Sequence, residues 1–211
     1  MRLPAILGVI ALAIVLPIGG LVGQPSVSQP PDQRGNAVAT VETLHQALLA
    51  VMREANVLGF PGRRERLAPV VASSFDFPTI SATVVGGMQW RALTDAQRST
   101  MERTFRELTL ATYADRFTGY SDERFQTIVQ RPLRSGRTLV RTELVVPDAE
   151  PVRLDYVLHR VDDAWRIVNI LADGVSDLSV KRAEYSSILR TGGFDLLIAR
   201  LEEQIVELTA D

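Results

Sequence analysis

Four strand-like segments with bulky apolar faces occupy residues 125–170, and no catalytic motif accompanies them. In the clearest segment Val152, Leu154, Tyr156 and Leu158 alternate with mostly polar residues, which is the period of a half-buried strand. The whole chain has two His and no Cys, and it lacks a glycine-rich phosphate loop, metal-ligand spacing and a nucleophile motif. The sequence therefore favours a protein that holds an apolar molecule over one that transforms a polar molecule.

The N-terminus has the layout of a secretory signal peptide. One basic residue, Arg2, precedes an apolar run from Leu3 to Leu16, and small residues continue to Gly23. Because spanning a bilayer needs roughly 20 apolar residues, the strictly apolar run is short for a membrane helix. We expect residues 1–23 to be a signal peptide for export, with a retained inner-membrane anchor as the alternative.

A flexible linker and one folded body are expected after this segment. Residues 24–35 contain three prolines and almost no bulky apolar side chain, which is typical of a flexible linker. Residues 36–208 are enough for one domain with its own core, and without Cys that core is held by packing alone. Removing residues 1–23 takes away one basic residue, so the net charge moves from −2 to about −3. This balance gives no nucleic-acid signature, which would need a strongly basic patch, so no nucleic-acid partner is expected.

Helical spacing of apolar residues predicts helices on both sides of the strands. Thr94 and Gln97 form a capping box that opens the longest helix. Glycine-containing breaks follow several helices, and residues 174–179 read as a loop. The expected helices span residues 36–57, 63–73, 76–85, 94–117, 182–189 and 194–208.

The strands are expected over residues 124–129, 139–146, 152–159 and 165–170. Their short connections imply an antiparallel meander. Helices followed by a sheet and then by helices predict an α+β fold. We expect helices packed around a twisted four-stranded antiparallel sheet, as an NTF2-like lobe and a helical lobe that enclose an apolar pocket.

The ionisable residues give little support to catalysis. His45 lies among apolar residues of a helix and His159 at a strand end, so a structural or surface role is expected for each. Asp155 and Tyr156 are the only acid–base candidates, and adjacent residues of a strand point to opposite faces. No catalytic residue, metal or cofactor is therefore expected.

The surplus of apolar residues has two readings. These side chains can simply fill a core. Alternatively, the helix face around Phe105, Leu108, Tyr113 and Phe117 stands apart from the sheet and leaves a cavity. Tyr and Trp, with one polar end, suit the rim of such a cavity. The residues alone leave both readings open.

Two parts of the chain carry motifs that can be compared with known families. They are Trp90-Arg91, Thr94, Gln97-Arg98, Phe105, Leu108, Thr112-Tyr113-Ala114 and Tyr120-Ser121-Asp122 in the central part, and Asp155-Tyr156, Leu158, Trp165, Ile167, Gly174-Val175-Ser176 and Ser187-Ile188-Leu189 in the C-terminal part. These motifs resemble the MlaC/Ttg2D (toluene-tolerance) family, and the resemblance covers most of residues 37–208. Within it, the stretches 172–178 and 181–185 are similar to the HpnM branch, which is associated with hopanoid biosynthesis.

This resemblance implies a periplasmic lipid carrier that shuttles a phospholipid or a hopanoid between membranes. The implied partners are an inner-membrane transporter and an outer-membrane lipoprotein. The alternatives are an NTF2-like enzyme acting on a hydrophobic substrate and a periplasmic scaffold protein. The expected lipid-binding residues are Trp90, Phe105, Leu108, Tyr113, Phe117, Phe125, Val129, Val140, Leu144, Val146, Leu154, Tyr156, Leu158, Trp165 and Ile167.

Overall fold

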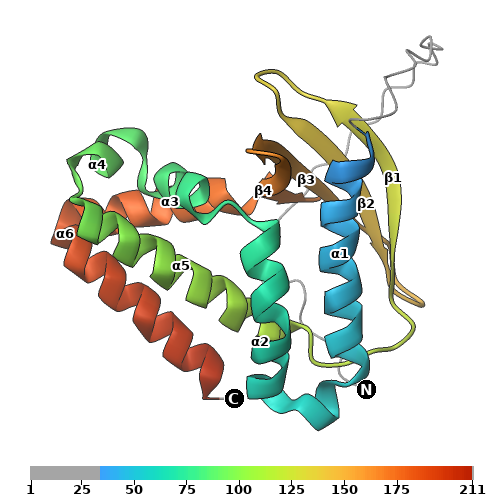
Figure 1. The fold of residues 1–211 in the computed structure, drawn as a ribbon. Helices are drawn as coiled ribbons and strands as arrows, with labels where there is room; N and C mark the ends of the chain where they lie inside the picture. The colour runs from blue at the N-terminus through green and yellow to red at the C-terminus, as the bar shows by residue number, and fades with distance from the viewer. Residues whose placement is uncertain (1–33, 211) are drawn as a thin grey trace, which may run out of the picture.

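The computed structural model describes residues 34–210 as a helical part beside a twisted sheet (Figure 1). The predicted signal peptide and most of the predicted linker lie outside the described residues. Arg34 and Gly35, placed in the linker by the sequence, belong to the first helix. The helices are α1 (Arg34–Arg53), α2 (Ala55–Ser74), α3 (Phe77–Val85), α4 (Gly87–Ala92), α5 (Asp95–Arg116) and α6 (Asp177–Thr209).

The strands form one antiparallel sheet in the order in which they occur along the chain. The α+β class is confirmed, but the sheet has five strands instead of four. The fifth strand is only two residues long and lies in the segment expected to be a loop, where the alternation is too short to detect. The strands are β1 (Arg124–Pro132), β2 (Thr138–Val145), β3 (Val152–Val161), β4 (Ala164–Ala172) and β5 (Val175–Ser176).

Two glycines interrupt the long helical segments. Gly59 in α2 has φ 59° and Gly193 in α6 has φ 73°, a left-handed region that residues with a Cβ rarely adopt. The predicted breaks near residues 59–62 and 192–193 are therefore present, although α6 begins at Asp177, earlier than expected. The six-residue α4 was missed, because the glycines at positions 86 and 87 indicated only the end of the preceding helix.

Asp76 fixes α3 to the sheet. Its side chain caps the helix by accepting from the backbone N–H of Thr79 at 3.1 Å, and it lies 2.6 Å from Nε2 of His159 on β3. Its own backbone N–H donates to the carbonyl of Ile167 on β4. Burial raises the pKa of Asp76, but hydrogen bonds from Thr79 and His159 outweigh it and the net pKa is lowered. The structural role expected for His159 is thus the one observed.

Two bulges decide which side chains face the helices. The pairing of β1 with β2 skips Ile128, so Gln130 instead of Val129 lies opposite Val140. The pairing of β3 with β4 skips Val168, which brings Ile170 opposite Tyr156. We call the side of the sheet that carries Val140 and Tyr156 the inner face, and the side that carries Arg141 and Asp155 the outer face.

The core lies between α1 and the inner face. Val41, Leu44 and Val51 of α1 are fully buried, as their helical spacing predicts. In Figure 1, α1 lies against the strands while α5 and α6 lie on the far side of α2. One part of the inner face is therefore covered by α1, and another part faces the space bounded by α5 and α6.

Candidate functional site: an apolar cavity with a charged mouth

A cavity of about 430 Å³ lies between the inner face of the sheet and the helices α3, α5 and α6. Pockets that hold small ligands commonly measure roughly 300–1,000 Å³. Most of its wall is apolar, and the apolar side chains come from the helices α1, α3, α5 and α6, from the C-caps of α2 and α5, and from the strands β1, β3, β4 and β5. They are Leu48, Phe75, Phe77, Ile80, Phe105, Leu108, Tyr113, Phe117, Phe125, Leu154, Tyr156, Ile170, Ala172, Val175, Leu178 and Val180.

Helix α5 supplies one continuous stripe of this wall. Phe105 and Leu108 are buried, Thr112 and Tyr113 are half-buried, and Arg116 at the end of the helix is exposed. The wall of α5 thus changes from apolar to charged as it approaches the surface. A ligand lying along this stripe would keep its apolar part deep and its polar part near Arg116.

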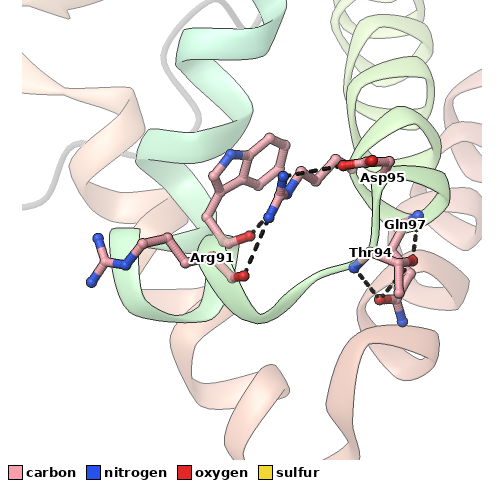
Figure 2. A network of polar contacts seen from close by, with 6 residues as sticks. Arg91, Thr94, Asp95 and Gln97 are labelled. Carbon is pink, nitrogen blue, oxygen red and sulfur yellow. Dashed lines mark hydrogen bonds and ion pairs between the residues drawn. The ribbon is translucent and has the colours of Figure 1, made fainter.

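The start of α5 is held by a network of polar contacts (Figure 2). The Thr94 side chain accepts from the backbone N–H of Gln97, and the Gln97 side chain accepts from the backbone N–H of Thr94, so the predicted capping box is present. Arg98 donates to the carbonyls of Trp90 and Arg91 at 3.1 and 3.2 Å and pairs with Asp95. These contacts fix the angle at which α5 enters the helical layer.

Aromatic rings make a second continuous surface of the cavity. Phe75 lies 5.8 Å from Phe77 and 6.2 Å from Tyr113, and Tyr113 lies 5.8 Å from Phe117 in an edge-to-face arrangement. These centroid distances are those of favourable aromatic pairs. The rings support one another from α3, from α5 and from the C-caps of α2 and α5, so the wall does not depend on one helix.

His45 is a buried polar group behind the cavity wall. Its Nε2 lies 2.9 Å from the Tyr156 hydroxyl, and its ring stacks on Phe125 at 3.8 Å between centroids. Burial lowers the pKa of His45 to about 3, so the ring is neutral at physiological pH. Burial also raises the pKa of Tyr113 and Tyr156, so both stay neutral. The deep wall therefore carries no charge, as an apolar occupant requires.

Charged residues gather at the mouth of the cavity. Arg116 comes from the end of α5, while Asp177, Lys181 and Glu184 come from the first turns of α6. Lys181 lies 3.7 Å from Asp177 and forms a surface ion pair with it. The mouth is thus polar with both signs of charge, in contrast to the neutral interior.

Seven of the fifteen predicted lipid-binding residues line the cavity. Three of them come from the sheet and four from α5, and they are Phe105, Leu108, Tyr113, Phe117, Phe125, Leu154 and Tyr156. The sequence missed the contributions of Phe75, which follows α2, of α3 and of the start of α6, such as Ile80 and Leu178. Their only signal was apolar spacing within short helices, which does not distinguish a cavity wall from a core.

The other predicted residues lie elsewhere. Val140, Leu158, Trp165 and Ile167 pack in the core, and Leu144 is also buried away from the cavity, because α1 covers that part of the inner face. Val146 follows the end of β2 and does not reach the cavity. Val129 was wrongly assigned to the inner face, since the bulge at Ile128 turns it to the outer face, where it is 42% exposed. Trp90 lies on α4 against Arg98.

The acid–base candidates do not come together. Tyr156 lines the cavity, whereas Asp155 lies on the outer face and forms two hydrogen bonds, at 2.7 and 2.9 Å, with Arg141. Among the described residues no group of three or more His, Cys, Asp or Glu could hold a metal ion. Across residues 34–210, no helix is long and apolar enough to cross a membrane. The largely apolar lining of the cavity suits an apolar molecule.

This architecture defines a class of α+β binding proteins in which helices and an antiparallel sheet enclose an apolar cavity. Residues 42–203 match the family model described as "MlaC protein", so the chain belongs to the MlaC family. A solved structure of similar fold is the phospholipid-binding protein from Ralstonia solanacearum, in complex with a phospholipid. It has a TM-score of 0.70 and 22% sequence identity, over 83% of this chain and 99% of that chain.

Proposed function

We propose that this protein is a periplasmic lipid carrier that buries the apolar tails of a phospholipid or a hopanoid and shuttles it between membranes. The observation that carries the proposal is the neutral, largely apolar cavity with charged residues only at its mouth. Membership of the MlaC family and the phospholipid in the structural neighbour support lipid as the occupant. The chain's similarity to the HpnM branch is the ground for a hopanoid as the second candidate.

The energetics suit a carrier without an energy source of its own. Each CH₂ removed from water contributes roughly 0.8 kcal/mol, so a chain of about 16 carbons would gain on the order of 12 kcal/mol in the cavity. A bilayer offers the same chain a similar apolar environment. The free energy of the chain in the cavity is therefore close to its free energy in the membrane. Transfer can then run in either direction, and partner proteins at the inner and outer membranes would set that direction.

The cavity is tested by a charge on its wall. Leu154→Glu puts a carboxylate on the wall that Phe125, Tyr156 and Ile170 also line, and burying an unpaired charge strongly disfavours an apolar occupant. The full chain is incubated with vesicles of labelled phosphatidylethanolamine and re-isolated, and lipid per protein is counted. We expect wild type to take up lipid and to release it to acceptor vesicles. The amount of lipid bound per protein should be at least about tenfold lower for the variant.

Val161→Glu is the matched control, because it introduces the same carboxylate on the same strand at a residue that is 38% exposed and away from the cavity. It should take up lipid like wild type. Equal uptake by Leu154→Glu and Val161→Glu, both folded, would show that lipid does not enter this cavity.

A further inference from the structure

The outer face of the sheet carries a cluster of arginines that the lipid cavity does not use. Asp155 on β3 is buried, and Arg141 on β2 binds it through Nε and a terminal nitrogen. Arg153 approaches the same carboxylate at 3.8 Å. Hydrogen bonds from Arg141, with the nearby charges of Arg141, Arg153 and Arg131, lower the pKa of Asp155, so it stays ionised.

The strand register places these groups on one surface. Arg141 pairs with Asp155 on one side and Val129 on the other, and Arg153 pairs with Glu143. Arg131 lies two residues beyond Val129 and therefore on the same face. Because Tyr156 points into the cavity and its neighbour Asp155 points away, this surface faces away from the lipid. In Figure 1 the helices gather on the other side of the sheet.

The cluster has more positive than negative charge, although the chain as a whole is negative. Three arginines share Asp155, and Glu143 lies beside them, in a chain whose net charge is −2. Each guanidinium has five N–H donors, and one carboxylate accepts only a few of them. The Nε of Arg153 is buried and has no hydrogen-bond partner in the described part of the chain. The Arg141 and Arg153 side chains keep 30% and 42% of their surface exposed.

We propose that this arginine cluster is the docking surface for an acidic face of a partner protein. Guanidinium groups bind carboxylates in a planar two-point geometry, and Asp155 already holds Arg141 in a fixed orientation. The half-exposed Val129, on the edge strand β1 next to Arg141, supplies an apolar contact beside the charged residues. Fixed positions of Arg, Asp and Glu favour one register with a complementary partner.

A protein partner fits this surface better than a membrane does. Basic segments that bind anionic lipids carry several cations without interspersed carboxylates. Here Asp155 and Glu143 alternate with the arginines on a rigid sheet, and the exposed apolar residue beside Arg141 is a valine instead of an inserted aromatic ring. The proposal goes beyond the lipid-binding function, because it concerns the face of the sheet opposite the cavity.

Photo-crosslinking in living cells tests the surface directly. A photoreactive residue replaces Val129 in the full exported chain, and mass spectrometry identifies whatever protein it captures and the peptide at the link. We expect one discrete protein adduct with an acidic linked peptide. Arg131→Glu and, separately, Arg153→Glu should reduce that adduct by about tenfold or more. Both variants leave Arg141 on Asp155, and Arg131→Gln checks the result with a milder change.

Arg190→Glu is the matched control, since Arg190 is exposed on α6, which lies with the other helices on the helical side of the sheet (Figure 1). It should keep the adduct. An adduct that survives charge reversal at Arg131 and Arg153 would overturn the proposal, and so would the absence of any protein adduct. Co-sedimentation with phosphatidylcholine–phosphatidylglycerol vesicles that depends on the same arginines would overturn it in favour of a membrane. Bound lipid, counted in every variant, should stay at the wild-type level. This measurement tests lipid binding in the cavity independently of docking.

Discussion

The inner face of the sheet is divided into two regions that have similar residues and different neighbours. The packed half, with Val140, Leu158 and Ile167, lies in the core against α1 and is almost fully buried. The open half, with Leu154, Tyr156 and Ile170, lines the cavity together with α5 and α6. Both halves are apolar, so composition does not separate them. The difference lies in which helix stands opposite, so one half packs in the core and the other half lines the cavity proposed to hold the lipid.

His45 sits at the boundary of the two halves and gives the largest expected effect on stability. The folded-state pKa is about 3 and the unfolded value is 6.5, so between these pH values the unfolded chain binds more protons. Stability should therefore be full above about pH 6.5 and fall as the pH drops towards 3, by about 5 kcal/mol in all. Urea unfolding across this range, compared with His45→Gln, measures the effect. If the free energy of unfolding falls equally with pH in wild type and in His45→Gln, the lowered pKa of His45 is contradicted.

Truncation of a side chain in the packed half should lower the free energy of unfolding more than the same truncation in the open half. Leu158 is fully buried, so Leu158→Ala should lower the free energy of unfolding by about 2–5 kcal/mol. Leu154 is half-buried and already borders a void, so Leu154→Ala should cost roughly 1–2 kcal/mol. Urea unfolding of lipid-free protein compares the two. Equal costs would remove the distinction between the halves.

The capping box of α5 gives the smallest expected effect. Thr94→Ala removes the side-chain acceptor at the start of α5 and should cost about 1 kcal/mol, with lipid uptake retained. Ser99→Ala, a change on the exposed surface of the same helix, is the control and should stay within about 0.5 kcal/mol of wild type. If Thr94→Ala abolishes lipid uptake while the protein stays folded, the start of α5 does more than position the wall.

Much of the fold follows from local patterns. The alternation of Val152 to Leu158 predicts β3, the Thr94–Gln97 pair predicts the start of α5, and the glycines at 59 and 193 mark real breaks. These features depend on residues that are close in the sequence. The two-residue β5 and the six-residue α4 are too short to show a period, so their existence depends on tertiary packing.

The site could be predicted only in part, for two physical reasons. An apolar side chain looks the same in the sequence whether it meets a helix or a void, so Leu158 and Leu154 could not be told apart. A bulge changes the face of every residue after it, and nothing in the residues around Ile128 marks one. That is why Val129 was expected in the cavity and is found on the outer face.

The most direct test of the central claim is native mass spectrometry of the exported full chain, purified without detergent, with lipid extraction from the same sample. The account predicts a discrete adduct with the mass of a lipid, lost on Leu154→Glu and kept on Val161→Glu. The mass of the adduct would choose between a phospholipid and a hopanoid. A single mass for the protein alone, from a sample that also takes up no lipid from vesicles, would contradict the account.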